Sequence, residues 1–343
     1  MQKSGNIICC FGELLLRFSP RMQGVFIKES LMPMYVGGAE LNVATALANW
    51  GLPVNYISAL PDNFLSKEIL DAIASKNIAV NNVILCGERI GIYYLPQGAD
   101  MKHNAVIYDR NHSSFSSLYP GQINWDKALE NIAWLHVSAI SPALSAQAAA
   151  VCLEAVKAAS DKDITVSIDL NYRAKLWQYG VNPIDIMPEI VQHCDVVMGN
   201  VWSAESLLQV KVDSGFSHSG ATKNTYLLQA DKTADEIMKR FPKCKFVANT
   251  FRFDENDGIR YFASLKSKEA NFHSTTYHAQ NIVDKVGSGD CFMGGLIYGI
   301  FNNHPTQNII EFAAAAAFGK LHIKGDTTSN TVDDIKKIIT ANG

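Results

Sequence analysis

The segment from Asn281 to Leu296 constrains the fold of this 343-residue chain more than any other. It consists of a partly apolar stretch that leads into the small-residue turn Gly287-Ser288-Gly289, then the acid Asp290 and a predicted helix. Small residues let backbone N–H groups approach an anion closely, and a helix N-terminus behind them adds about half a positive charge. A carboxylate beside an anion site is repulsive unless it takes a proton from the group that attacks that anion. The segment therefore favours phosphoryl transfer to a hydroxyl, with Asp290 as the base and residues 287–290 as the anion hole.

A structural interpretation of the same segment, a turn followed by a helix-capping acid, is equally open at this point. The composition, with 48% apolar and 18% charged residues, is typical of a globular protein, and a net charge of −3 offers no basic field for nucleic acid. Seven cysteines without a C-x-x-C pair predict free thiols in a reducing compartment. The N-terminus shows no cleavage-site pattern, and no apolar run approaches eighteen residues. We expect a cytoplasmic protein that binds neither nucleic acid nor membrane.

Short apolar runs that suit buried strands alternate with amphipathic or alanine-rich stretches that suit helices. This alternation predicts one α/β domain. Strands are expected at 7–11, 53–60, 132–138, 164–168, 194–198, 246–248, 258–265 and 273–277, and helices at 41–51, 64–76, 143–160, 312–324 and 333–340.

The pattern changes between residues 83 and 118. Residues 89–95 and 105–110 alternate as two antiparallel strands would, and such a pair needs a partner surface to be stable. Together with residues 14–35, the stretch 88–118 therefore predicts a small β lid over the site. The candidates for its inner face are Tyr93, Tyr94, Tyr108 and Arg110, although aromatic strand residues are more often packing residues.

Polar side chains follow the expected strands where functional groups gather in open α/β sheets. Glu13 and Arg17 come after the first strand, where charges on an edge in water are the alternative. Asp169, Asn171 and Arg173 fall on one side of an extended chain, a grouping that would suit a polyol or an acid, although Arg173 could also form a structural salt bridge. The diglycine Gly37-Gly38 permits close backbone approach to a ligand, and Asn42 lies one turn into the helix that follows.

These motifs resemble those of the ribokinase-like (PfkB) carbohydrate kinases along nearly the whole chain. The stretch 37–44 is similar to the N-terminal signature of that family, and 283–290 is similar to its C-terminal signature. Gly12-Glu13 and Asp169-x-Asn171-x-Arg173 also match. Within the family the resemblance is to the 2-keto-3-deoxygluconate kinases, because of residues 12–20, Tyr108-x-Arg110 and the Val-Asp-Lys-Val form of the last motif.

The resemblance implies a Rossmann-like three-layer sandwich with a mainly parallel central sheet, a single domain over residues 1–343, and the β lid. It also implies ATP as donor, Mg²⁺, and room for a monovalent cation. Catalysis would fall to Asp290, Gly287, Ser288 and Gly289; sugar binding to Arg17, Gly37, Gly38, Asn42, Tyr93, Tyr108, Arg110, Asp169, Asn171 and Arg173; and nucleotide binding to Asn200, Asn249, Thr250, Arg252, Gly287 and Gly289. Glu205 is the candidate metal residue, because Ser203 stands where the family carries a glutamate.

Three arginines, Arg17, Arg110 and Arg173, would favour a carboxylate on the sugar. The expected reaction is phosphorylation of a sugar-acid primary hydroxyl, 2-keto-3-deoxygluconate to its 6-phosphate. Alternatives are a kinase for a neutral sugar such as fructose or ribose, and a non-catalytic sugar-binding relative. A nicotinamide dehydrogenase would need a G-x-G-x-x-G after the first strand, which is absent. An exposed lid edge invites pairing with a second lid, so a homodimer is expected.

Overall fold

The structure is a computed structural model that describes residues 5–20, 31–96, 106–216, 222–255 and 258–342. Parts of the predicted lid, residues 21–30 and 97–105, lie outside the described residues.

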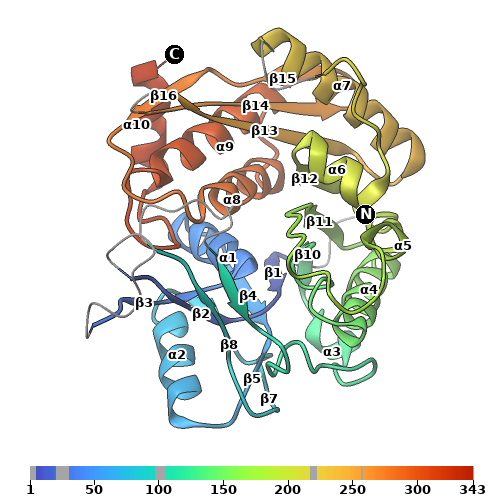
Figure 1. Cartoon of the computed structure of the whole chain (residues 1–343), viewed down its shortest axis with the longest axis vertical. Coiled ribbons are helices and arrows are strands. Elements are labelled where there is room, and N and C mark those ends of the chain that lie inside the picture. Colours follow the sequence, from blue (N-terminus) through green and yellow to red (C-terminus); the bar gives the residue numbers. More distant parts are fainter. Residues whose placement is uncertain (1–4, 21–30, 97–105, 217–221, 256–257, 343) are drawn as a thin grey trace.

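A ten-stranded sheet forms the centre of the molecule, in the order β15-β14-β13-β12-β11-β10-β1-β4-β6, with β16 paired to β14 (Figure 1). Pairing is parallel from β6 to β13 and antiparallel beyond β13, so the predicted mainly parallel α/β sheet is confirmed. Its strands are β1 (Ile7–Phe11), β4 (Val54–Ile57), β6 (Ile78–Ala79), β10 (Ile132–Ser138), β11 (Thr165–Asp169), β12 (Val196–Gly199), β13 (Phe246–Glu255), β14 (Gly258–Ser267), β15 (Asn271–His273) and β16 (Tyr277–Gln280).

Helices cover both faces of this sheet, because successive side chains of a buried strand point to opposite faces. In β1, Ile8 and Cys10 join the core beneath α1, α8 and α9, whereas Cys9 and Phe11 join the core beneath α4 and α5. No helix within the described ranges is both long and apolar enough to cross a membrane. The helices are α1 (Ala39–Asn49), α2 (Phe64–Ala74), α3 (Trp125–Ala128), α4 (Ala146–Asp161), α5 (Pro183–Val191), α6 (Val201–Leu208), α7 (Lys223–Arg240), α8 (Ser288–Phe301), α9 (Thr306–Lys320) and α10 (Val332–Asn342).

A separate four-stranded sheet, in the order β3-β2-β8-β9, confirms the predicted lid. It consists of β2 (Leu15–Phe18), β3 (Met34–Gly37), β8 (Gly91–Tyr94) and β9 (Ile107–Asp109). The two predicted strands of residues 89–110 do pair antiparallel, as β8 and β9, while β8 pairs parallel with β2.

Three strand predictions need correction. The stretch 53–60 is divided between β4 in the central sheet and β5 (Ala59–Leu60), which pairs with β7 (Ile84–Leu85) in a two-stranded sheet. Residues 274–276 separate β15 from β16: both strands run antiparallel along β14, but the register shifts between the pairs His273–Ser264 and Tyr277–Tyr261. The strand expected at 246–248 is longer than predicted. Residues 249–252 lie in the middle of β13, which forms a hairpin with β14.

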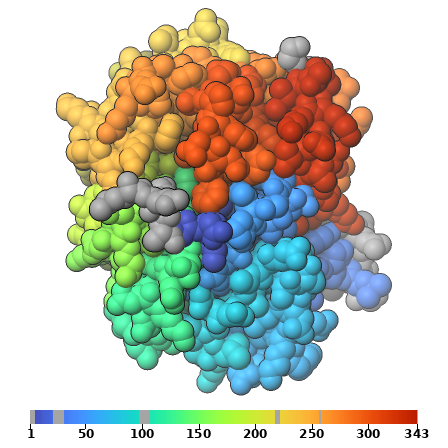
Figure 2. Space-filling model, turned by 180° about the vertical axis from the view of Figure 1, so that it is seen from behind, coloured from blue at the N-terminus to red at the C-terminus, as the bar shows by residue number. Residues whose placement is uncertain are grey.

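Close packing around α8 fixes the position of its N-terminus. A Cβ on Gly295 would lie 2.6 Å from Ala313 Cα of α9, and one on Gly294 would lie 3.2 Å from Ala46 Cβ of α1. Seen from behind, the orange and red C-terminal residues lie directly against the blue N-terminal ones (Figure 2). One bond across this boundary runs from Trp50 Nε1 to Asn330 O at 3.0 Å. Glycine at two successive positions thus lets α8 lie between α1 and α9.

Candidate active site

A cavity of about 750 Å³ lies between the lid and the carboxyl ends of β11 and β12. The lid contributes Tyr93, Tyr108 and Arg110 to its wall, and Asp169 and Gly199 end the two strands below. This volume suits a small-molecule ligand with several polar contacts.

The 287–290 turn lines the cavity where α8 begins. Gly287, at the N-cap, has a φ of 76°, in the left-handed region that favours glycine. A Cβ at this position would lie 1.8 Å from the carbonyl oxygen of Asp326, so no other residue fits without a shift of the backbone. The unpaired N–H groups of the first turn of α8 therefore face the cavity with their positive end of the helix dipole.

Asp290 is the acid of this turn and is 8% exposed. Its Oδ2 accepts a hydrogen bond of 2.6 Å from Asn42 Nδ2 on the neighbouring helix α1. Burial raises the pKa of Asp290 to about 7, while the Asn42 bond and the charge of Arg173 act in the lowering direction. A carboxylate with a pKa near neutrality is well matched to accept and release a proton.

Asp169, the last residue of β11, forms a second buried acid in the cavity. Burial raises its pKa to about 8, and the charge of Asp290 raises it further while Arg173 lowers it. Asn171 and Arg173 line the same wall, so the alternate polar residues of this stretch do converge.

Glu40 lies behind these two acids and was not predicted. Its Oε1 accepts bonds from Ser138 N at 3.0 Å, Ser138 Oγ at 2.7 Å and Ser141 Oγ at 3.0 Å. Burial raises the pKa of Glu40, and Glu40 in turn contributes to the raised pKa values of Asp169 and Asp290.

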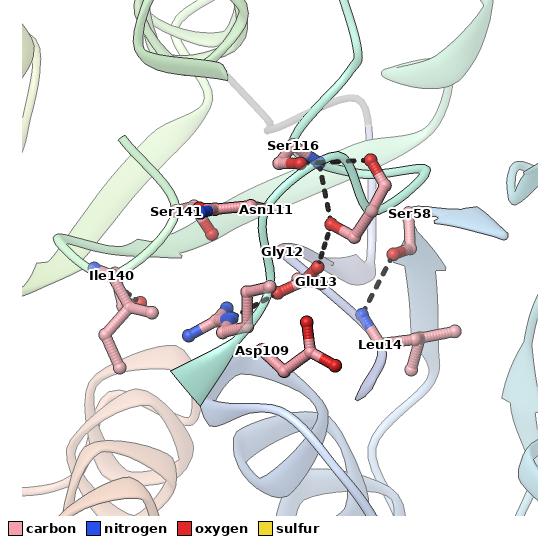
Figure 3. A network of polar contacts seen from close by, with 12 residues as sticks. Gly12, Glu13, Leu14, Ser58, Asp109, Asn111, Ser116, Ile140 and Ser141 are labelled. Carbon is pink, nitrogen blue, oxygen red and sulfur yellow. Dashed lines mark hydrogen bonds and ion pairs between the residues drawn. The ribbon is translucent and has the colours of Figure 1, made fainter. Parts of the chain in front are cut away.

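Arg110 is held by an ion pair with Glu13. Glu13 lies two residues after β1 and is labelled in Figure 3. Arg110 Nε lies 2.5 Å from Glu13 Oε2, and the Ser113 hydroxyl donates to Glu13 Oε1. Arg110 is 6% exposed and lines the cavity, so its orientation towards a ligand is set by the paired carboxylate. In the same view, the backbone N–H of Leu14 donates to Ser58 Oγ at 3.1 Å.

The structure brings most of the predicted site residues to the cavity. Those that line it are Gly38, Asn42, Tyr93, Tyr108, Arg110, Asp169, Asn171, Arg173, Asn200, Thr250, Arg252, Gly287, Ser288, Gly289 and Asp290. Gly37 lies beside it, where a Cβ would lie 2.6 Å from Asp326 Oδ2, and Asn249 is buried in β13.

Arg17 and Glu205 are placed elsewhere. Arg17 is 2% exposed and its Nη2 lies 3.1 Å from Asp284 and 2.7 Å from Asp326, so its charge is already balanced. Glu205 is exposed and accepts a bond of 3.1 Å from Val212 N. Among the residues that the structure describes, no three His, Cys, Asp or Glu side chains form a metal-binding group.

The remaining wall carries residues that sequence reasoning missed. Trp202 and Ser206 come from α6, whose N-cap Asn200 accepts a 2.8 Å bond from Ser203 N. Lys285 lines the cavity and its Nζ lies 2.7 Å from Asp254 Oδ1 on β13. Asp326 follows α9 and accepts a 3.2 Å bond from the Tyr93 hydroxyl. Lys285 lay inside the recognised motif, but nothing local in the sequence marked Asp326 as part of a site.

The family model described as pfkB family carbohydrate kinase matches residues 6–332. The chain belongs to the pfkB family of carbohydrate kinases. It is accordingly an enzyme of the phosphotransferase class with the ribokinase-like fold that its motifs predicted.

Three relatives illustrate the range of similarity within this kinase family. The chain is 31% identical to the crystal structure of a 2-dehydro-3-deoxygluconokinase from Thermotoga maritima, with a TM-score of 0.87 over 97% of this chain and 99% of that one. It is 24% identical to a 2-dehydro-3-deoxygalactonokinase from Haloferax volcanii over 96% of this chain and 95% of the relative. It is also 26% identical to a probable fructokinase-3 from Arabidopsis thaliana, over 89% and 80% of the two chains.

Proposed function

We propose that this kinase phosphorylates a sugar acid, 2-keto-3-deoxygluconate, on its primary hydroxyl to give the 6-phosphate. One observation carries the substrate class: Arg173 Nε and the Tyr108 hydroxyl are buried at the cavity wall without a hydrogen-bond partner among the described residues. Buried donors without partners are costly, so a ligand that accepts hydrogen bonds would stabilise them. A carboxylate beside the Arg173 guanidinium meets that need better than a neutral hydroxyl does.

The reaction follows from the buried acid and the turn. Asp290 accepts the proton of the attacking sugar hydroxyl while the new O–P bond forms and the bond to the leaving phosphate breaks. The N–H groups of residues 287–290 stabilise the negative charge on the transferring group, because they are fixed before the reaction begins. Asn42 keeps the Asp290 carboxylate in place through its 2.6 Å bond.

The donor that fits this arrangement is ATP. The N-terminus of α8 and the small turn could receive its terminal phosphates, and Asn200, Thr250 and Arg252 line the adjoining wall. Bound with Mg²⁺, ATP would supply the phosphoryl group.

All seven cysteines are free thiols, which supports the expected cytoplasmic location.

Asp290→Asn is expected to reduce turnover by about 10²–10⁴-fold, because the amide cannot accept the hydroxyl proton. Steady-state kinetics with a coupled ADP assay measures the loss, and circular dichroism verifies that the variant folds. Asp126→Asn, at a side chain that is 88% exposed, serves as the control and should leave the rate unchanged. A fully active Asp290→Asn enzyme would sink the assignment of the base.

The acid limb of the pH profile should report Asp290, whose pKa is raised to about 7 by burial. Only the ionised carboxylate can accept a proton, so kcat/KM should fall about tenfold per pH unit below that pKa. Asn42→Ala removes an interaction that lowers the pKa, and its acid limb should therefore move to higher pH. A profile that stays flat well into the acid range, or a limb that Asn42→Ala leaves in place, contradicts this role.

A substrate panel tests the sugar. We expect wild-type protein to phosphorylate 2-keto-3-deoxygluconate in preference to fructose and ribose, and Arg173→Gln to raise KM for the acid by about 10–100-fold, since a charged hydrogen bond is lost. Arg89→Gln is the matched control, because Arg89 pairs with Asp109 near the lid surface. Preferred turnover of fructose or ribose would refute the sugar acid while leaving the kinase assignment intact.

We also propose that the protein is a homodimer that pairs through its lid. The lid sheet ends in β3 and β9, and exposed apolar side chains lie at or next to both strands: Leu31 is 76% exposed, Met34 48% and Ile107 53%. Light scattering should give a dimeric mass for wild-type protein, and Met34→Lys should weaken the dimer by about tenfold or more, since a charge would be buried. Phe64→Lys, on α2, is the control. A monomeric wild-type protein rules out this assembly.

A further inference from the structure

Four charged side chains meet behind the 287–290 turn: the cations Arg17 and Lys320 and the acid Asp326, which are buried, and the acid Asp284, whose side chain is 14% exposed. Arg17 Nη2 lies 3.1 Å from Asp284 Oδ2 and 2.7 Å from Asp326 Oδ1. Lys320 is 0% exposed, and its Cε lies 3.5 Å from the position that a Cβ on Gly287 would take. Two positive and two negative groups therefore lie within one largely buried cluster.

This cluster holds the chain on both sides of the turn. Asp284 Oδ1 accepts a 3.0 Å bond from Val286 N, and its Oδ2 accepts a 3.1 Å bond from Gly325 N. Lys320 Nζ donates to Ile323 O at 2.9 Å. Because Gly287 packs against the carbonyl oxygen of Asp326, a displacement of either segment would move the anion hole.

The cluster also joins the turn to the lid. Arg17 lies on lid strand β2 and its guanidinium is 4.4 Å from the ring centroid of Tyr35 on β3. Tyr93, on β8, donates to Asp326 Oδ2 at 3.2 Å. Lid strands β2 and β8 thus contact the Asp326 carboxylate directly, and β3 contacts the Arg17 side chain that pairs with it.

This cluster does not suit a bound monovalent cation, for which the family resemblance left room. Such an ion would need oxygen ligands with an excess of negative charge, and both oxygens of Asp284 already accept hydrogen bonds. The Asp284 and Asp326 charges balance those of Arg17 and Lys320. Adding a further buried cation would leave an uncompensated positive charge, which is costly in a desolvated site.

We propose that Arg17 and Lys320 act as positioning residues whose fixed charges hold the catalytic turn, so that phosphoryl transfer by this enzyme does not depend on a monovalent cation. The proposal rests on the kinase function proposed above, although not on which sugar is the substrate. Arg17 links the turn to the lid through Asp284 and Asp326, and Lys320 packs against the turn beside Gly287.

The first test needs no variant. Wild-type rates with the best sugar of the panel should agree within about twofold in potassium, sodium and tetramethylammonium chloride at equal ionic strength and fixed ATP and Mg²⁺. Stimulation by potassium of about tenfold or more over tetramethylammonium would overturn the proposal. Because any phosphorylated sugar serves, a wrong sugar acid leaves this result interpretable.

A second readout is independent of turnover. Crystals of the wild-type protein soaked in thallium(I), a potassium analogue, should show no anomalous peak beside Asp284, and the Tm should be equal in potassium and tetramethylammonium. A thallium peak at that carboxylate, or a Tm raised by potassium alone, would overturn the proposal even if no sugar were phosphorylated.

Lys320→Met keeps the length of the side chain and removes its charge. We expect kcat to fall about tenfold or more with KM for the sugar within about twofold, because the turn and not the sugar contacts is disturbed. Potassium should restore part of the kcat that Lys320→Met loses, whereas it should leave the kcat of the wild-type enzyme unchanged. Arg17→Lys retains the charge but cannot bridge the two carboxylates, so it should lose less kcat than Arg17→Met does.

Lys324→Met, at an exposed lysine, is the control. An unchanged kcat in both Lys320→Met and Arg17→Met contradicts a positioning role, and if either variant fails to fold, the wild-type measurements decide.

Discussion

The close approach of Gly287 to the carbonyl oxygen of Asp326 determines where the 287–290 turn can lie, and the rest of the site depends on that contact. A Cβ would come within 1.8 Å of the oxygen, so the turn and the segment after α9 can meet only through glycine. Gly295 against Ala313 allows the same closeness one layer deeper, between α8 and α9. Backbone packing, more than any side-chain contact, therefore aims the N-terminus of α8 into the cavity and brings the Asp326 carboxylate within reach of Tyr93.

Burial of acids around that turn has an electrostatic consequence. Asp290, Asp169 and Glu40 are all desolvated, and burial raises the pKa of each because it disfavours the charged form; repulsion between the acids adds to this for Asp290 and Asp169. Arg173 opposes this effect for Asp169 and Asp290. Arg173 Nε has no hydrogen-bond partner among the described residues. Arg173 therefore lies near enough to the two acids to lower their pKa values and can still donate to a ligand.

The sequence predicted those parts of the site that a local pattern encodes. The 287–290 turn, Gly38 with Asn42, and Asp169 with Arg173 each form a motif within a few residues, and the alternation of strands and helices places them at one edge of the sheet. The sequence did not indicate that Glu40 and Asp326 belong to the site, because their partners, Ser138 and Tyr93, are far away in the chain. Arg17 was misplaced for the same reason: a lone arginine after a strand gives no indication that Asp284 and Asp326 will neutralise it.

Two buried arginines join the lid to the body through ion pairs, and these pairs limit how the lid can move. Arg17 binds Asp284 and Asp326, and Arg110 binds Glu13 at the end of the first strand. Separating a buried pair leaves charges without partners, at a cost of about 3–5 kcal/mol when one partner is removed. The lid residues Tyr93 and Tyr108 line the cavity beside these arginines. Under the proposed function, a sugar acid would meet side chains that these ion pairs hold in place, so that little binding energy is lost to organising them.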